Sequence, residues 1–88
     1  MSETDEQLAQ RAGRGDRPAL QRLLERHHDT AFRFSYRLLG SRADAQDVAQ
    51  EVCIRLVERI ASFRGESRFS TWLYQMVLNA CRDHVRRQ

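Results

Sequence analysis

The sequence has no lysine, and its 88 residues include only one proline, four glycines and two cysteines. Few helix-breaking residues, few β-branched residues and abundant Ala, Leu, Arg, Gln and Glu favour helices over strands. Cys53 and Cys81 belong to no Cys-x-x-Cys or Cys/His ligand spacing, so neither a metal nor another cofactor is expected. Both thiols lie among apolar positions and should be buried and reduced. We therefore predict an all-α protein.

Long apolar runs are also missing. No segment approaches the run of about twenty apolar residues that crosses a bilayer, so membrane insertion is not expected. The acidic and polar start, Met1 to Leu8, is unlike a signal peptide, and we expect a cytoplasmic protein. Apolar residues make up 41% and charged residues 31%, which suits a small domain with a thin core. The length predicts a single domain over residues 1–88.

All 15 cationic residues are arginines, and the formal net charge is +3. This balance is compatible with an anionic partner but does not require one. Arginine pairs with phosphate in a bidentate manner and stacks on bases, which would suit a nucleic acid. A GC-rich genome would also favour arginine codons, so composition alone does not show whether the arginines bind a nucleic acid.

Apolar residues recur at spacings of three and four in four segments, and each segment predicts a helix. The second stripe includes His27 and Leu38 and the third includes Val57, all of which we expect to face the core. A short first helix is followed by three longer ones, with predicted bounds of 4–14, 17–39, 43–62 and 70–87.

Short polar residues mark the predicted helix ends. Asp16 should cap the second helix, and Ser41 should cap the third, with Asp44 completing a capping box. Gly40 should end the second helix in a left-handed conformation. The fourth helix has two candidate caps, Ser70 and Thr71.

The last predicted helix carries an exposed stripe of amide and guanidinium groups. Four side chains fall within about 60° of one another on the side away from the apolar face. Such groups read base edges and phosphates in DNA complexes. An ordinary solvated helix face can have the same composition, so the stripe alone does not distinguish a DNA-binding surface from a solvated one. Its members are Gln75, Asn79, Arg82 and Arg86.

The segment 63–69 interrupts the helical period and is the candidate functional loop. Aromatic walls beside hydroxyl groups and cations suit the binding of an unstacked base. Alternatively, the rings anchor the loop to the core, which is the preferred interpretation for Phe69 and Trp72. The candidate DNA contacts in and beside the loop are Phe63, Arg64, Ser67, Arg68 and Ser70.

The third predicted helix exposes Asp47, Gln50 and Glu51 on one face. An acidic helix face in a basic protein suggests a protein partner rather than DNA. Ordinary surface pairing is also expected on this helix, with Glu58 beside Arg55 and Arg59.

No catalytic constellation is found, and an enzyme is not expected. The hydroxyl-bearing residues near the loop have no neighbouring base in the sequence. His27 and His28 have no carboxylate at metal-ligand spacing; His27 should be a hydrogen-bonded core histidine and His28 should be exposed.

Several strings together resemble the second conserved region of sigma-70 family factors, and in particular the extracytoplasmic-function (ECF) group. The resemblance covers nearly the whole chain. The strings are residues 44–52, residues 63–74, Asn79 with residues 81–83, residues 15–16 with Ala19, and residues 37–40.

The resemblance implies a compact four-helix bundle of the sigma region 2 type. Asp47, Gln50 and Glu51 would contact the clamp coiled coil of the RNA polymerase β′ subunit. The loop would hold a base flipped from the non-template strand of the promoter minus-ten element, and Asn79, Arg82 and Arg86 would read or clamp that element. An anti-sigma factor is a further expected partner. The family's second DNA-binding domain, region 4, is absent from this sequence, and the bare helical end suggests a domain cut from a longer chain.

Two other functions stay open on the residues alone. The chain could be an autonomous regulator that places its last helix in the major groove of duplex DNA. It could also be a helical adaptor with no role in nucleic-acid binding. The acidic face of the third helix argues against the first of these.

Overall fold

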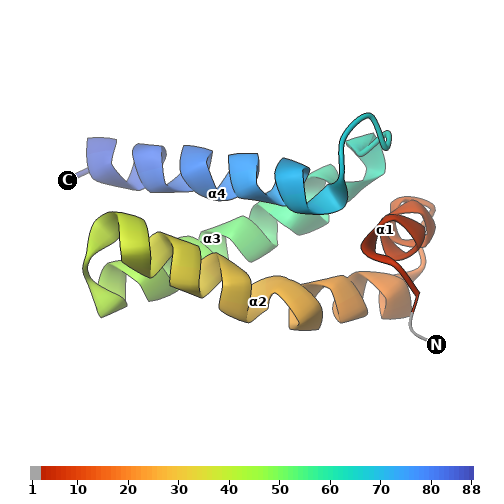
Figure 1. Cartoon of the computed structure of the whole chain (residues 1–88), viewed down its shortest axis with the longest axis horizontal. Helices are drawn as coiled ribbons and strands as arrows, with labels where there is room; N and C mark the ends of the chain where they lie inside the picture. Colours follow the sequence, from red (N-terminus) through yellow and green to blue (C-terminus); the bar gives the residue numbers. More distant parts are fainter. Residues whose placement is uncertain (1–2) are drawn as a thin grey trace.

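The computed structural model describes residues 3–88; the first residues of the segment Met1 to Leu8 therefore lie outside the described part. Within it, four α-helices and one short 3₁₀ turn account for all the regular secondary structure (Figure 1). The predicted all-α architecture is confirmed, with helix bounds shifted by a few residues at most. The elements are α1 Asp5–Gly13, α2 Arg17–Leu39, α3 Arg42–Arg59, η1 Ile60–Ser62 and α4 Phe69–Arg86.

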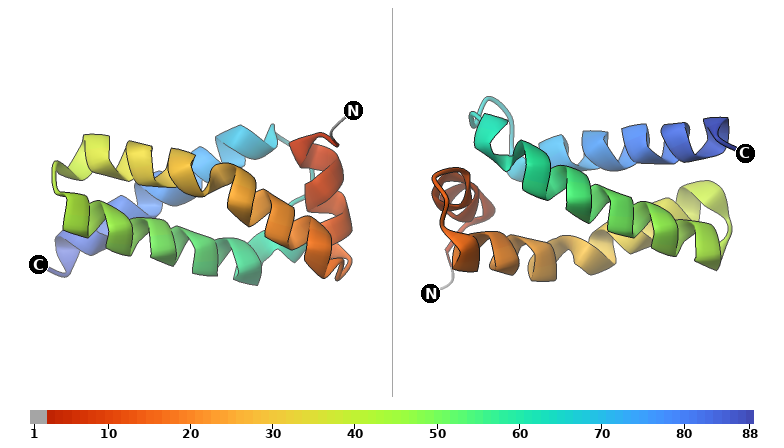
Figure 2. Two further views of the ribbon diagram at one scale, coloured as in Figure 1. Left: turned by 90° about the horizontal axis from the view of Figure 1, so that it is seen from below. Right: turned by 180° about the vertical axis from the view of Figure 1, so that it is seen from behind.

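The three longer helices run along the long axis of the molecule, whose extents are 38 × 24 × 20 Å. α2 and α3 form an antiparallel pair joined by a tight turn, and α4 packs against both of them (Figures 1 and 2). The short helix α1 lies across one end of this bundle, beside η1 and the loop that leads into α4. The chain therefore brings its first helix next to a loop about sixty residues away in sequence.

One hydrophobic core receives side chains from all four helices. Burying each large apolar side chain contributes about 1.5–3 kcal/mol. Among the residues that are no more than 2% exposed are Leu8, Leu23, Val48, Val52, Leu56, Phe69 and Val77. Two predicted core residues are not in it: Leu38 is 50% exposed and Val57 is 47% exposed. Both predictions were wrong because the helical period shows which face of a helix is apolar, but it does not show how much of that face the neighbouring helices cover.

The predicted caps of α2 and α3 are confirmed. The Asp16 carboxylate accepts a hydrogen bond from the Ala19 amide at 3.2 Å, and the Ser41 hydroxyl accepts one from the Asp44 amide at 3.2 Å. Gly40 ends α2 at φ 70°, a left-handed conformation that glycine adopts without strain. The predicted capping box at Ser41 is not completed, because the Asp44 carboxylate instead lies 3.1 Å from His84 Nε2.

The predicted cap of α4 was wrong. The helix begins at Phe69, so Ser70 and Thr71 lie within its first turn, and Arg68 at the cap position makes no side-chain capping bond. A different group satisfies the first free amide: Glu6 Oε2 in α1 accepts a hydrogen bond from the Phe69 N–H at 2.8 Å. Within residues 3–88, no helix is both long enough and apolar enough to cross a membrane.

Candidate nucleic-acid interface

The loop between η1 and α4 comprises residues 63–68 and presents polar groups to solvent. Arg64, Ser67 and Arg68 are exposed, and Gly65 turns the chain at φ 74°. A side chain at this position would strain the backbone, so the turn depends on glycine. The predicted loop residues therefore do lie together at one end of the bundle.

Aromatic side chains hold the two ends of the loop against the core. Phe69 is fully buried, with its ring centroid 5.7 Å from that of Phe63 and 5.8 Å from that of Trp72. The predicted anchoring role of Phe69 is confirmed. Trp72 is only half-buried, and so is Phe63, whose ring lies 5.1 Å from the indole. Phe63 thus anchors the loop, and part of its surface stays accessible.

Two hollows flank the loop, and residues of α1 line both. The larger, about 520 Å³, is lined by Asp5, Glu6, Gly65, Glu66, Ser67, Arg68 and Ser70. The smaller, about 290 Å³, is lined by Glu6, Gln10, Phe63, Arg64 and Gly65. The sequence did not point to Asp5, Glu6 or Gln10 as parts of this region, since only the folded chain places α1 there.

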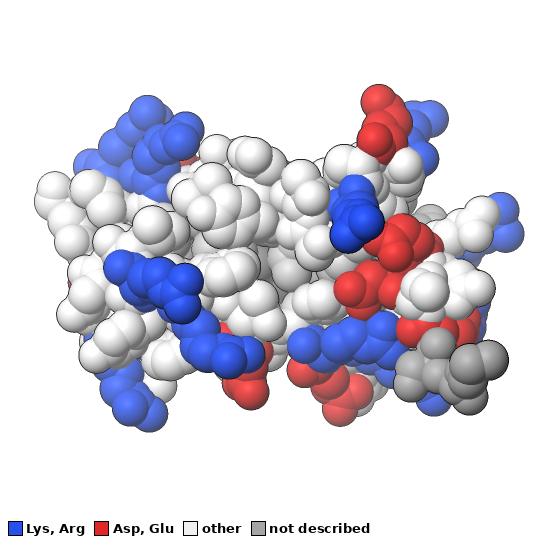
Figure 3. Space-filling model, in the orientation of Figure 1, with Lys and Arg blue, Asp and Glu red and all other residues white. Residues whose placement is uncertain are grey.

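The stripe on α4 is exposed as predicted. Gln75, Asn79, Arg82 and Arg86 all face solvent, and none of the four makes a side-chain hydrogen bond or ion pair with another of residues 3–88. Arginine side chains gather over the C-terminal part of α4, whereas acidic side chains gather over α1 (Figure 3). The charge of this surface therefore changes along α4, from mixed near the loop to positive at the far end.

The acidic face of α3 borders a groove of about 730 Å³ between α2 and α3. Asp47 and Gln50 are exposed and line it. Glu51 is partly covered, because its carboxylate accepts a hydrogen bond from Arg55 Nε at 3.0 Å. Of the three predicted docking residues, Glu51 is engaged with Arg55, whereas Asp47 and Gln50 make no side-chain hydrogen bond or ion pair within residues 3–88.

Arg55 joins α3 to α4 rather than pairing with Glu58. Its side chain is 12% exposed, and its Nη2 lies 2.8 Å from the Asp83 carboxylate in addition to the bond to Glu51. The hydrogen bond from Arg55 lowers the pKa of Asp83 below its ordinary value. The predicted pairing of Arg55 with Glu58 was wrong, since local spacing does not reveal a carboxylate on another helix.

His27 is half-buried between α1 and α4. Its Nε2 lies 2.9 Å from Asp5 Oδ1, and its ring centroid lies 5.1 Å from that of Phe69. The approach to Asp5 lacks hydrogen-bond geometry, so this buried nitrogen has no hydrogen-bond partner within residues 3–88. The expectation of a hydrogen-bonded core histidine is therefore not met, whereas His28 is exposed as expected.

The cysteines are free thiols, Cys81 buried and Cys53 half-buried, and burial raises the pKa of both. A raised pKa disfavours the reactive thiolate at neutral pH. Within residues 3–88, no group of three or more His, Cys, Asp or Glu side chains is arranged to hold a metal ion.

Known proteins resemble this chain in sequence and in fold. The sequence model of the Sigma-70 region 2 family matches residues 23–88. The RNA polymerase sigma-H factor of Pseudomonas aeruginosa is 36% identical over 83 residues, which cover 94% of this chain and 43% of that protein. The ECF RNA polymerase sigma-E factor of Haemophilus influenzae is 38% identical over 85 residues, covering 97% of this chain and 44% of that protein. The chain thus spans less than half the length of these relatives.

A solved structure agrees over the whole chain. It is an engineered region 2 of sigmaE, determined by NMR in complex with GTAAAA, and it superposes with a TM-score of 0.88 at 33% identity. The match covers 100% of this chain and 94% of that one. Sequence and fold agree on one assignment, and this chain belongs to the Sigma-70 region 2 family, among relatives that are ECF sigma factors.

Proposed function

We propose that this domain recognises and melts the promoter minus-ten element while it is docked on RNA polymerase. The observation that carries the proposal is that the exposed loop 63–68 leads directly into α4, which carries the exposed polar stripe. Both lie on accessible surface, and the side chains of the stripe make no hydrogen bond or ion pair within residues 3–88. The complex of the similar engineered sigmaE region 2 with GTAAAA supports a nucleic-acid ligand for this domain.

In the proposed mechanism, the loop captures one base of the non-template strand after it leaves the duplex stack. Capture offsets an unpairing free energy of a few kcal/mol through stacking and hydrogen bonds. Ser67 and Ser70 offer hydroxyl groups at the larger hollow, and the accessible part of the Phe63 ring borders the smaller one. Arg64 and Arg68 are available for the flanking phosphates.

The α4 stripe would hold the neighbouring nucleotides. Asn79 and Gln75 can donate to and accept from base edges, and an amide side chain pairs well with adenine. Arg82 and Arg86 would contact phosphates, which fixes the register of the strand without reading its sequence. The mixed charge near the loop and the positive charge at the end of α4 fit this division (Figure 3).

The α3 face would dock on the clamp coiled coil of the polymerase β′ subunit. Asp47 and Gln50 are the accessible contact residues, and Glu51 would contribute through its remaining exposed surface. Docking keeps promoter DNA near the loop, so the flipped state of the base becomes favoured at the high local concentration. An anti-sigma factor that covered either surface would block initiation, and we propose one as a further partner.

Two titrations test the proposal. The first measures binding of the domain to a purified β′ clamp coiled-coil fragment, with Asp47→Arg as the variant. We expect saturable binding by the wild type and loss of binding by the variant, which should keep a native circular dichroism spectrum because Asp47 is exposed. Equal binding by the two proteins would contradict the docking face.

The second titration uses pools of labelled single-stranded hexamers, including GTAAAA, and the corresponding duplexes. We expect sequence-dependent binding to single strands and weaker binding to duplexes. Preference for intact duplex would instead indicate the alternative, a regulator that binds the major groove. Binding to no nucleic acid in the presence of polymerase would favour a helical adaptor.

A further inference from the structure

Helix α1 contacts both ends of the loop 63–68, although residues 5–13 lie outside the part of the chain that the family model matches. At the α4 end, Glu6 accepts the hydrogen bond from the Phe69 amide at 2.8 Å. The first amides of a helix have no acceptor within the helix, and a side chain at the cap position usually bonds the second or third of them. Arg68 makes no such bond, and the first amide is satisfied from another helix.

At the η1 end, α1 packs on the backbone. A Cβ atom placed on Gly13 would lie 3.2 Å from the Ile60 carbonyl oxygen and 3.5 Å from Ala61 Cα. These distances leave little room for any side chain larger than hydrogen. The two ends of α1 therefore fix the two ends of the loop: Gly13 against η1, where the loop begins, and Glu6 against Phe69, where it ends.

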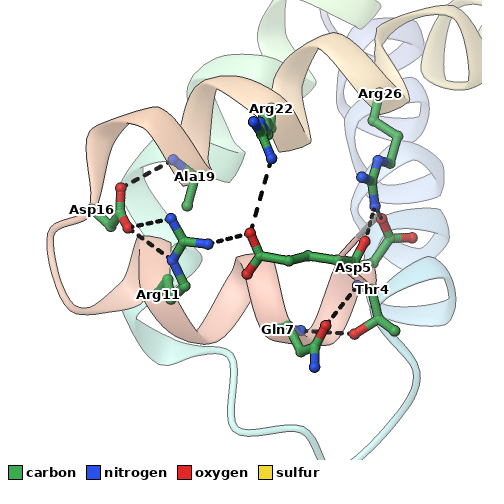
Figure 4. A network of polar contacts seen from close by, with 9 residues as sticks. Thr4, Asp5, Gln7, Arg11, Asp16, Ala19, Arg22 and Arg26 are labelled. Carbon is green, nitrogen blue, oxygen red and sulfur yellow. Dashed lines mark hydrogen bonds and ion pairs between the residues drawn. The ribbon is translucent and has the colours of Figure 1, made fainter. Parts of the chain in front are cut away.

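α1 is itself held firmly on α2 by polar contacts (Figure 4). Arg11 reaches Asp16 at 2.8 Å, and it also pairs with Glu3. On the other side, Arg26 Nη1 lies 3.0 Å from Asp5 Oδ1. The Thr4 hydroxyl and the Gln7 side chain complete a reciprocal capping box at the start of the helix. A helix anchored in this way can transmit a fixed geometry to the loop.

We infer that α1 is a positioning element for DNA binding, and that Glu6 is its positioning residue. This inference rests on the proposed function. Glu6 orders the loop through the Phe69 amide, so that the base-binding hollows exist before the DNA arrives. An ordered loop loses less conformational entropy on binding, which raises affinity beyond any contact that Glu6, which lines both hollows, makes with the strand itself.

Loss of the positioning role and loss of the negative charge of Glu6 should change DNA affinity in opposite directions. Removal of an acidic group beside the loop reduces repulsion of phosphates and on that ground alone strengthens DNA binding. Loss of the cap disorders the loop and weakens binding. The direction of the change therefore separates the two effects.

The test measures the dissociation constant for the tightest-binding single-stranded hexamer from the pools above, well below the melting temperature of each variant. Glu6→Ala is expected to weaken binding about fivefold, which corresponds to about 1 kcal/mol. Glu6→Gln retains an acceptor oxygen and should bind nearly as the wild type does. Glu25→Ala is the matched control, since it removes the same charge from an exposed position on α2.

A second variant approaches the loop from its other end. Gly13→Ala pushes a methyl group toward the Ile60 carbonyl and should also weaken DNA binding. All variants should bind the β′ clamp fragment as tightly as the wild type, because α3 is not altered.

The outcomes are distinguishable. Weaker DNA binding by Glu6→Ala and Gly13→Ala, with rescue in Glu6→Gln, supports the inference. Unchanged or tighter DNA binding by Glu6→Ala overturns it and leaves the proposed function intact, since a purely structural cap would lower the melting temperature only. A wild-type domain that binds no single strand, either free or in the presence of polymerase, overturns the proposed function and the inference with it.

Discussion

Phe69 offers a sharp test of how the loop is attached to the core. Its ring is fully buried at the first position of α4, where its centroid lies 5.1 Å from that of His27. It also contacts Phe63 and Trp72, the two half-buried aromatic residues beside the loop. Phe69→Ala would remove all three ring contacts and leave a cavity under the start of α4.

The expected loss is large for a domain of this size. A buried Phe→Ala substitution lowers the free energy of unfolding by about 3–5 kcal/mol. A chain of 88 residues has a total stability of about 4–13 kcal/mol, so the variant should lose a substantial fraction of it. At about 4–8 °C per kcal/mol, the melting temperature should fall by at least 12 °C.

Thermal unfolding followed by circular dichroism, together with urea titration, measures this loss. Val85→Ala is the control: Val85 is 57% exposed on the same helix, and its substitution should change stability by no more than about 0.5 kcal/mol. Should Phe69→Ala be unfolded at all temperatures, Phe69→Leu should fold with a smaller loss. A Phe69→Ala protein within about 1 kcal/mol of the wild type would refute the anchoring role, because so small a loss is incompatible with a filled site.

Three further predictions concern α4 and its contacts. Asn79→Ala should change the ranking of minus-ten sequences by about 1–3 kcal/mol of discrimination while leaving polymerase affinity unchanged, which competition binding among promoter variants would measure. Trp72→Ala should destabilise the domain less than Phe69→Ala, on the order of 2 kcal/mol, because the indole is half-buried; an equal or larger loss in urea titration would contradict this. The hydrogen bond with His84 lowers the pKa of Asp44 below its ordinary value of 3.8, so its stabilisation is complete above pH 3.8 and is lost as the pH falls through the lower folded-state pKa. Asp44→Asn should therefore reduce the dependence of the melting temperature on pH below about pH 4. An unchanged pH profile would count against the pairing of Asp44 with His84.

Sequence reasoning succeeded where structure depends on neighbours in the chain. Asp16, Ser41 and Gly40 form their predicted caps because each acts on residues within the adjacent turn. The exposure of the α4 stripe followed from helical period alone, since the apolar residues of α4 occupy the opposite face. The roles of these exposed residues in binding DNA or polymerase stay predictions.

Sequence reasoning failed where a partner comes from a distant segment. The cap of α4 is Glu6, separated from Phe69 by 63 positions, and the second partner of Arg55 is Asp83, separated by 28. Asp44 likewise turns away from its local capping role toward His84, 40 positions along the chain. Local spacing cannot reveal such pairs, and it therefore favours a nearby polar residue as the partner.

The packing of α1 shows that the boundary of the family match differs from the boundary of the packed structure. The family model begins at residue 23, in the middle of α2, whereas Leu8 is fully buried and Ala12 is 6% exposed in the core. A protein shortened to the matched residues would expose that part of the core to water and leave the first amide of α4 without its acceptor. The segment that the family model matches is therefore smaller than the packed unit, and a protein trimmed to residues 23–88 should be less stable than one that keeps the preceding helix.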